Sequence, residues 1–191
     1  MTLSILYVCT GNICRSPLAE RYTVHRLAHV APDVAHLVRV ASAGTRGLEG
    51  HPIDALAGQQ LVRHGGVATG FAGRRLTAGH VEGADLVLTM TREQRAVAVT
   101  EAPSGLRRTF TLLEAADLTG RTDADGGPAE LVAAMAAGRS AARPDDYDVA
   151  DPIGGSPELH LSVADSIVRA VDVVTDALVS RLRRVPGRAE R

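Results

Sequence analysis

The stretch LSILYVCTGNICRSP, residues 3–17, decides the fold class. Its first six residues are mostly apolar, which is typical of a short strand buried on both faces of a parallel sheet. The strand runs directly into Cys9. Ser16 followed by Pro17 indicates a helix start, with Ser16 as the N-cap and the helix ending near His29. A strand, a loop and a helix in this order predict the first half of a βαβ unit.

The rest of the chain continues the alternation of strands and helices. In the last helix, apolar residues recur at helical spacing from Leu159 to Leu182, behind Ser156 as the N-cap. The alternation predicts an α/β, three-layer fold, with a four-stranded parallel sheet, helices on both faces and a ligand-binding loop after the first strand. We expect further strands at 37–41, 85–90 and 108–112, helices at 54–65, from 92, at 129–137 and at 157–182, and loops at 119–127 and 143–155.

Length and composition are those of an ordinary globular protein. Its 191 residues are 45% hydrophobic and 23% charged, and the net charge is -1. We expect one domain, residues 1–185, followed by a flexible tail at 186–191. The charge balance points to neither a nucleic-acid nor a membrane partner. Two cysteines five positions apart, with no secretory leader, favour chemistry in a reducing cytoplasm. The oligomeric state is not predicted.

Residues 9–16 combine groups that bind a phosphate. If this loop curls around an anion, successive backbone N–H groups point inward and form an anion nest. The helix that follows directs its positive amino end at the same place. Arg15 adds a planar guanidinium that matches two phosphate oxygens. We therefore predict a phosphate-binding loop made of Thr10, Gly11, Asn12, Ile13, Cys14 and Arg15.

The same surroundings favour the ionised form of Cys9. A helix amino terminus and a nearby cation stabilise a thiolate, and the Ser16 hydroxyl can donate a hydrogen bond to the sulfur. We predict that Cys9 is the nucleophile of a phosphatase that forms a phosphocysteine intermediate. Cys14 has two interpretations, a passive loop residue or a thiol that forms a reversible disulfide with oxidised Cys9. We expect no cofactor and no metal ion.

Residues 8–17, VCTGNICRSP, resemble the signature of the bacterial low-molecular-weight protein tyrosine phosphatases. Ser42-Ala43-Gly44 and Asp151-Pro152 are further points of likeness, whereas the stretch 119–142 is longer than in that family. The resemblance implies a phosphoric monoester hydrolase in which Asn12 braces the loop by hydrogen bonds. It also implies that Asp151 is the general acid, which protonates the leaving oxygen and then activates water.

The assignment of the acid depends on this resemblance. An aspartate before a proline often only starts a turn. From the residues alone, Asp145, Asp146 and Asp148 are therefore candidates as well. The resemblance selects Asp151.

The substrate is less directly indicated than the chemistry. Phosphotyrosine enzymes of the family often carry aromatic residues where this chain has Leu48 and Ile153, our two predicted pocket residues, and Phe71 replaces a frequent histidine. Ile13 favours an aryl phosphate, because members that dephosphorylate arginine tend to carry threonine there. We expect a phosphorylated protein, with phosphotyrosine first, or a small phosphate ester. An arsenate reductase that uses an external thiol and a catalytically silent phospho-ligand binder are the alternatives.

Overall fold

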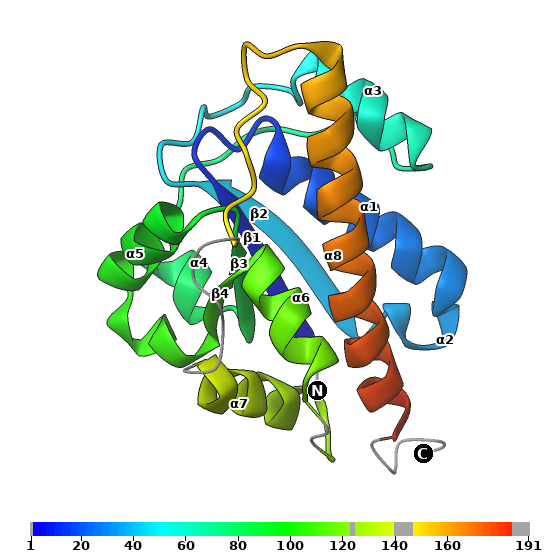
Figure 1. The fold of residues 1–191 in the computed structure, drawn as a ribbon, viewed down its shortest axis with the longest axis vertical. Helices are drawn as coiled ribbons and strands as arrows, with labels where there is room; N and C mark the ends of the chain where they lie inside the picture. The colour runs from blue at the N-terminus through cyan, green and yellow to red at the C-terminus, as the bar shows by residue number, and fades with distance from the viewer. Residues whose placement is uncertain (1, 123–124, 140–146, 185–191) are drawn as a thin grey trace.

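The computed structural model describes residues 2–122, 125–139 and 147–184. Four strands form one parallel sheet in the order β2-β1-β3-β4 (Figure 1). The strands are β1 (Leu3–Cys9), β2 (Val38–Gly44), β3 (Leu86–Thr89) and β4 (Thr109–Thr111). The helices are α1 (Arg15–Val30), α2 (Pro32–Ala35), α3 (Ala55–Arg63), α4 (Ala78–Glu82), α5 (Arg92–Glu101), the 3-10 helix η1 (Pro103–Arg108), α6 (Leu112–Gly120), α7 (Pro128–Gly138) and α8 (Pro157–Arg184).

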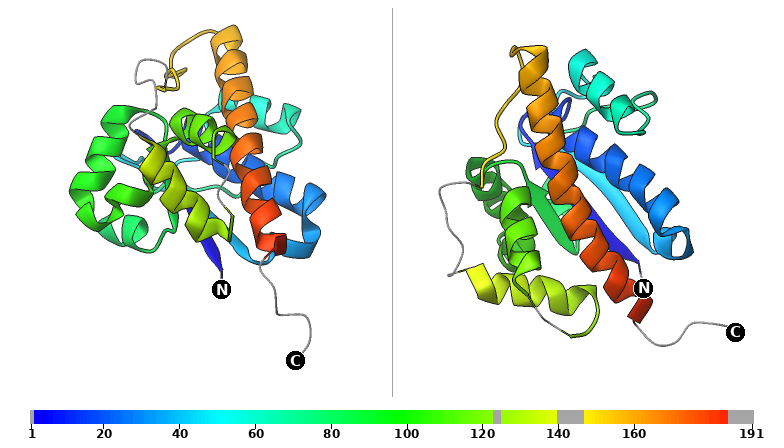
Figure 2. Two further views of the ribbon diagram at one scale, coloured as in Figure 1. Left: turned by 60° about the horizontal axis from the view of Figure 1, so that its bottom comes forward. Right: turned by 45° about the vertical axis from the view of Figure 1, so that its right-hand side comes forward.

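The two faces of the sheet are covered by different helices. Alternate residues of a strand point to opposite faces. Ile5 and Tyr7 of β1 therefore belong to the main core, with residues of α1, α3, α6 and α8. Leu6 and Val8 belong to a second core, with residues of α4 and α5. The right-hand view of Figure 2 shows α8 lying along one face beside α1. The predicted fold, a parallel four-stranded sheet with helices on both faces, is confirmed.

The register of the sheet brings the carboxyl ends of its strands to one edge. Cys9 pairs with Gly44 at the end of β2, and Val8 pairs with Thr89 at the end of β3. Thr89 in turn pairs with Thr111 at the end of β4. Ligands of open parallel sheets bind beyond this edge. The segments that follow the ends of the four strands are therefore the candidates for a functional site.

The structure differs from the sequence predictions mainly in short helices. We did not predict α2, α4, η1 or α6, each of nine residues or fewer, since such segments do not show a long apolar stripe. The predicted strand at 108–112 is only Thr109–Thr111, and the predicted loop at 119–127 begins inside α6. A capping box of Thr111 and Glu114 starts α6 immediately after β4.

The carboxyl-terminal helix agrees with the prediction. The hydroxyl of Ser156 accepts a hydrogen bond from the Leu159 N–H at 3.3 Å, and α8 continues to Arg184. The expected tail at 186–191 lies outside the described residues, as do Asp145 and Asp146. Among the described residues, no helix is both long and apolar enough to cross a membrane.

Candidate active site

The loop after β1 is fixed from outside through its carbonyl groups. The carbonyls of Cys9, Thr10, Gly11 and Ile13 all accept hydrogen bonds from one segment, residues 45–54. Their donors are the N–H groups of Thr45, Arg46, Leu48 and Asp54, at 2.7–3.0 Å. Because these carbonyls face segment 45–54, the loop turns its N–H groups the other way.

Several N–H groups of the loop are left without a partner in the part of the chain that the structure describes. Within the described residues, the N–H groups of Gly11, Ile13 and Cys14 have no hydrogen-bond acceptor. Helix α1 begins at Arg15, and its N-cap residue Cys14 makes no side-chain cap. The amino end of α1 therefore adds its partial positive charge and free donors to the loop. This arrangement is an anion nest.

Cys9 lies at the base of the nest. Its side chain is buried, and two donors point at its sulfur. The Ser16 hydroxyl donates to Cys9 Sγ at 3.0 Å, and the Asn12 N–H donates at 3.2 Å. Both donors can stabilise negative charge on the sulfur, as a nucleophile or a leaving group at this position would require.

Ser16 is not the helix N-cap that we predicted from the sequence. The helix starts at Arg15, two residues earlier than predicted, so Ser16 lies in its first turn. The Ser16 hydroxyl is directed at Cys9 instead of at a backbone N–H of the turn. Pro17 lies in that same first turn, where its missing N–H costs no helical hydrogen bond.

Asn12 holds the loop in its curved conformation. It is fully buried and has φ of 54°, a left-handed conformation that asparagine adopts more readily than most residues. Its side-chain amide donates to the hydroxyls of Ser16 at 3.0 Å and Ser42 at 2.8 Å. Its side-chain carbonyl accepts from the Arg74 N–H at 2.8 Å. One side chain therefore joins the loop to β2 and to the segment before α4.

A buried acid supports this brace, and the sequence analysis did not single it out. Ser42 donates its hydroxyl to Glu20 in α1, so a chain of hydrogen bonds runs from Glu20 through Ser42, Asn12 and Ser16 to Cys9. Burial raises the pKa of the Glu20 carboxyl, although its bond to Ser42 acts in the opposite direction. Glu20 lies near the start of α1 and faces Ser42, a placement that only the folded structure reveals.

Close packing of β2 against the loop explains why glycine ends the sequence Ser42-Ala43-Gly44. A Cβ on Gly44 would lie 2.5 Å from the carbonyl oxygen of Thr10 and 2.9 Å from the N atom of Asn12. Any side chain there would displace the backbone of the loop, so the position requires glycine.

The opposite side of the loop is held by α5. Gln94 donates from its side-chain nitrogen to the Thr10 hydroxyl at 3.1 Å. Its side-chain oxygen accepts from the N–H groups of Met90 and Thr91 after β3. Gln94 is buried, and we did not predict its role because a lone glutamine belongs to no motif.

Arg15 is buried and directed into the site. It donates from one terminal nitrogen to the Val149 carbonyl at 3.0 Å and from the other to Asp151 at 2.7 Å. Its Nε is buried and has no partner among the described residues. A buried guanidinium with an unpaired N–H is a donor for an anion in the nest.

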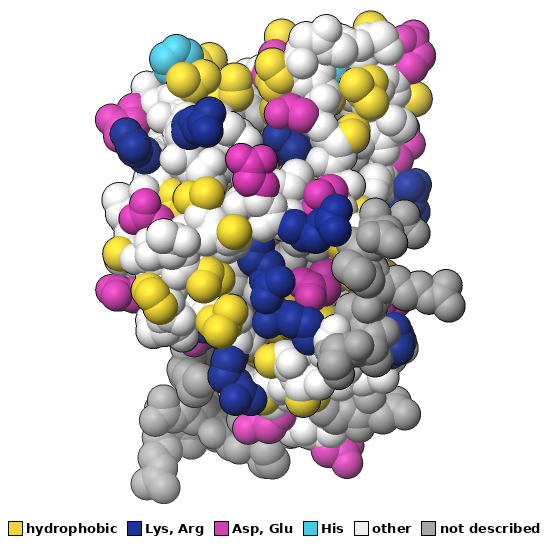
Figure 3. All heavy atoms as spheres, turned by 60° about the vertical axis from the view of Figure 1, so that its left-hand side comes forward, with side chains coloured by type: hydrophobic (Ala, Val, Ile, Leu, Met, Phe, Trp, Pro, Cys, Tyr) yellow, Lys and Arg dark blue, Asp and Glu magenta, His cyan; other side chains and the backbone are white. Residues whose placement is uncertain are grey.

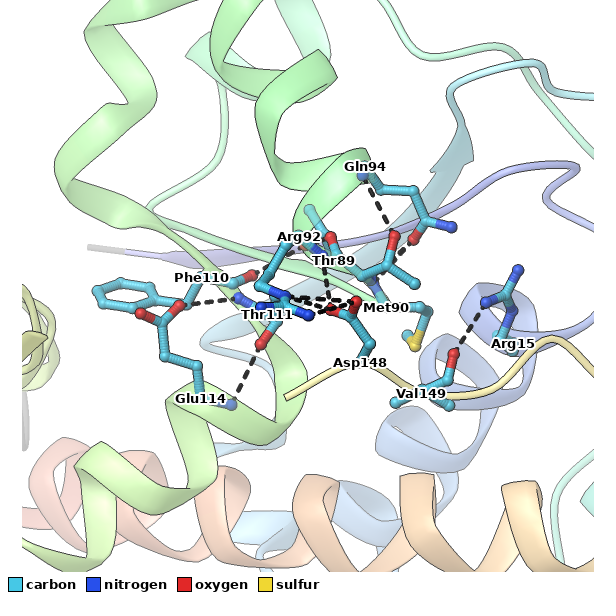
Figure 4. A network of polar contacts seen from close by, with 11 residues as sticks. Arg15, Thr89, Met90, Arg92, Gln94, Phe110, Thr111, Glu114, Asp148 and Val149 are labelled. Carbon is cyan, nitrogen blue, oxygen red and sulfur yellow. Dashed lines mark hydrogen bonds and ion pairs between the residues drawn. The ribbon is translucent and has the colours of Figure 1, made fainter. Parts of the chain in front are cut away.

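Residues 147–151 form a strap that carries Asp151 to the site, as the view in Figure 4 shows in part. The Val149 N–H donates to the Met90 carbonyl at 2.8 Å, which continues the pairing beyond the end of β3. Asp148 accepts hydrogen bonds from the backbone and guanidinium of Arg92. Tyr147 donates its hydroxyl to Asp117 at 2.6 Å. The strap is therefore attached to β3, α5 and α6 before it reaches Asp151.

The structure separates Asp151 from the other candidate acid that it describes. Asp151 contacts Arg15 and is 52% exposed, so it can reach a ligand in the nest. Asp148 is engaged at the amino end of α5 by Arg92. The geometry therefore places Asp151, and not Asp148, beside the loop.

The mouth of the site is apolar on the side of segment 45–54. A Cβ built on Gly11 would meet the side chains of Ile13 at 3.4 Å and Leu48 at 4.0 Å. Leu48 is 43% exposed, and Ile153, two residues after Asp151, is 49% exposed. Both predicted pocket residues are therefore exposed, and neither supplies an aromatic ring; that they line a pocket stays a prediction.

Cys14 is a buried free thiol in the same cluster as Cys9. Burial, followed by the neighbouring charges of Cys9 and Asp54, raises the pKa of Cys14 far above its ordinary value. At neutral pH Cys14 is therefore protonated. Among the described residues, no group of three or more histidine, cysteine or acidic side chains is arranged to hold a metal ion.

Comparison with known proteins identifies the family. Residues 4–125 match the low molecular weight phosphotyrosine protein phosphatase family. The chain therefore belongs to this family. The matched range includes the whole loop after β1 and ends before Asp151 and α8, so it carries no information on the acid.

Individual relatives differ in how much of the chain they match. The low molecular weight protein-tyrosine-phosphatase Etp of Escherichia coli is 46% identical over 100 residues, which are 52% of this chain and 62% of Etp. The chain thus matches about three fifths of the length of that relative. A protein-arginine-phosphatase of Geobacillus stearothermophilus is 27% identical over 93% of this chain and 97% of its own length. The solved YwlE arginine phosphatase of the same organism superposes with a TM-score of 0.73 at 26% identity, covering 98% of this chain and 99% of YwlE.

Proposed function

We propose that this protein is a cysteine-dependent phosphatase that hydrolyses phosphate monoesters, with protein phosphotyrosine as the first substrate. The observation that carries the proposal is the convergence on Cys9 Sγ of two hydrogen-bond donors inside an anion nest that Arg15 completes. Thr10, Gly11, Asn12, Ile13 and Cys14 would supply the rest of the nest. We further propose that residues 1–185 act as one domain in the cytoplasm.

In the first step, the phosphate binds in the nest and Arg15 clamps two of its oxygens. The Cys9 thiolate attacks phosphorus, a sulfur–phosphorus bond forms, and the bond to the leaving oxygen breaks. Asp151 gives its proton to that oxygen, so the product leaves as an alcohol or phenol. For this role Asp151 must leave Arg15, with which it pairs at 2.7 Å, and take up a proton. Bound phosphate releases Asp151, because it replaces the carboxylate as the anionic partner of Arg15.

In the second step, water hydrolyses the phosphocysteine. Asp151, now a carboxylate, accepts a proton from the water as its oxygen attacks phosphorus. The sulfur–phosphorus bond breaks and Cys9 leaves as a thiolate. The hydrogen bonds from Ser16 and from the Asn12 N–H stabilise the negative charge on the sulfur as it forms. Inorganic phosphate is released and the resting state returns.

Two substrate classes are supported by different observations. The apolar mouth formed by Ile13 and Leu48 favours a phenyl ring over a charged guanidino group. In contrast, one relative that matches nearly the whole chain is a protein-arginine-phosphatase. We place phosphotyrosine first because Ile13 and Leu48 are residues of this chain, whereas the arginine phosphatase activity is that of a relative. A small phosphate ester, and arsenate reduction with an external thiol, would use the same nest.

Hydrolysis of para-nitrophenyl phosphate tests the reaction class. A phosphotyrosine peptide and a phosphoarginine peptide of otherwise identical sequence then test the substrate. We expect turnover of para-nitrophenyl phosphate and a higher kcat/KM for the phosphotyrosine peptide. No phosphate release from any of the three would contradict the proposed activity, and a higher kcat/KM for phosphoarginine would reverse the substrate assignment.

A further inference from the structure

Five arginines follow the edge of the sheet formed by β4, and we call them the arginine stripe. They come from two helices, α5 and η1, and from the residue after α7, and they are Arg92, Arg95, Arg107, Arg108 and Arg139. Figure 3 shows the face that carries α5, with basic side chains gathered in a column. The chain contains no lysine, so this column consists of arginine.

The stripe is fixed in place by contacts with the edge strand and its surroundings. Arg95 donates from Nε to the Thr109 carbonyl at 3.0 Å, and Arg139 donates to the same carbonyl at 2.8 Å. The guanidinium of Arg139 also lies over the Phe110 ring, 4.3 Å from its centroid. Arg108 donates to the carbonyl of Ser104 at 3.0 Å. Carbonyl partners orient these cations without neutralising them.

The stripe carries an excess of positive charge. Arg139 pairs with Glu114 and Arg92 pairs with Asp148. In the part of the chain that the structure describes, Arg95, Arg107 and Arg108 have no carboxylate within 4.0 Å, so these three cations are not held in ion pairs. Burial and the neighbouring Arg95 lower the pKa of Arg139, in keeping with cations held close together.

Some of these cations retain free donors. Arg95 uses only Nε in its recorded contact, so both of its terminal nitrogens remain without a partner among residues 2–122, 125–139 and 147–184. Arg107 is exposed, and no side-chain bond to it is found in the same residues. A guanidinium with free donors binds carboxylates in a planar, two-pronged geometry.

The stripe begins beside the phosphate nest. Gln94, which contacts Thr10 of the nest, lies in the first turn of α5 between Arg92 and Arg95. Asp148, the partner of Arg92, is adjacent to Val149, whose carbonyl holds Arg15. From this end the stripe continues past Thr109, the first residue of β4, to η1. A chain whose phosphoresidue sits in the nest can therefore extend over the stripe.

We propose that the arginine stripe binds an acidic segment of a phosphoprotein substrate next to its phosphorylated residue. The inference rests on the proposed phosphatase function and names the substrate class, acidic phosphoproteins. The free donors of Arg95 and Arg107 bind the carboxylates of that segment. Arg108 and Arg92 add to the positive electrostatic potential of this edge. The overall charge of -1 makes the stripe a local feature of this edge, which favours a short acidic peptide over a long polyanion such as nucleic acid.

The test compares three substrates: para-nitrophenyl phosphate, a phosphotyrosine peptide with glutamates on both sides, and the same peptide with glutamines. The variants are Arg95→Gln, Arg107→Gln and the double variant. Arg107→Gln removes an exposed side chain that makes no hydrogen bond or ion pair with the described residues, so we expect the fold to be unchanged. Arg39→Gln is the matched control, because Arg39 is exposed on β2, the opposite edge of the sheet.

We expect the parent protein to favour the acidic peptide over the neutral one by about tenfold in kcat/KM at low salt. Each exposed charge pair contributes a factor of about two to five. The double variant should lower the preference to about twofold or less, through KM, and leave para-nitrophenyl phosphate turnover unchanged. Arg39→Gln should behave as the parent. Added salt should weaken the preference, since it screens exposed charges.

Each other outcome has a distinct meaning. If the parent does not hydrolyse para-nitrophenyl phosphate, the proposed function fails and the inference fails with it. If it does, but both peptides react equally well or Arg39→Gln has the same effect as the double variant, only the inference is wrong. Inhibition by a short RNA that the double variant abolishes, without any peptide preference, would overturn the inference in favour of nucleic acid.

Discussion

Replacing Asp151 by asparagine distinguishes two effects of this side chain. One is the proposed proton transfer to the leaving group, and the other is the ion pair with Arg15. The ion pair to Arg15 is half exposed on the Asp151 side, so water screens it, and it contributes at most about 1 kcal/mol. Its loss changes phosphate affinity by no more than about fivefold. Loss of a general acid instead costs ~10²–10⁴-fold. Asp151→Asn should therefore slow phenyl phosphate by ~10²–10⁴-fold and a strongly acidic phenol ester by far less.

The assay is the phosphorylation rate for a series of aryl phosphates, plotted against the pKa of the leaving phenol. The slope should steepen in Asp151→Asn, because a basic phenol needs a proton and an acidic one does not. Asp148→Asn is the control, since Asp148 is occupied by Arg92 away from the nest, and it should change little. An unchanged slope in Asp151→Asn, or a steeper slope in Asp148→Asn instead, would refute the assignment of the acid.

Three further changes test other parts of the site. Arg15→Lys keeps the charge but loses the planar fork, so kcat/KM should fall by orders of magnitude; near-normal kinetics would show that Arg15 is not the clamp. Mild peroxide should give a Cys9–Cys14 disulfide that a reductant reverses. The disulfide should form faster as pH rises, because the raised pKa of Cys14 leaves little thiolate at neutral pH. Mass spectra with only sulfinic or sulfonic acid at Cys9 would argue against this. Burial raises the pKa of Glu20, so the folded state holds this proton more tightly and stability falls as pH rises from ~4.3 through the raised value. The melting temperature of Glu20→Gln should therefore rise relative to the parent across that range, and a constant difference would count against a buried, shifted carboxyl.

Patterns of sufficient length predicted the fold. The apolar run before Cys9 and the 28-residue stripe of α8 each indicate one element strongly, and both are present. The short helices were missed because their starts depend on single caps, as with Thr111 and Glu114 of α6. The end of β2 was placed three residues early, because Ser42 reads as polar although its hydroxyl is satisfied inside the fold.

The candidate site was predictable where its residues are contiguous. Residues 9–16 lie in one loop. The structure pairs Asp151 with Arg15, and the role of Asp151 as the acid stays a prediction. Gln94 and Glu20 could not be found from the sequence, since they reach the loop from helices whose orientation only the packed sheet defines. The N-cap prediction for Ser16 was wrong because the helix begins at Arg15 and the Ser16 hydroxyl donates to the sulfur of Cys9 instead.

The central claim is that phosphate is transferred to the sulfur of Cys9. Rapid acid quenching of the parent protein during turnover of para-nitrophenyl phosphate, followed by peptide mass spectrometry, tests it directly. We predict phosphate on the peptide that contains Cys9, together with a first burst of phenol equal to the enzyme concentration. Cys9→Ser, with the fold verified by circular dichroism, should show neither the modification nor turnover. Phosphate on another residue, or substantial turnover by pure Cys9→Ser, would contradict the account.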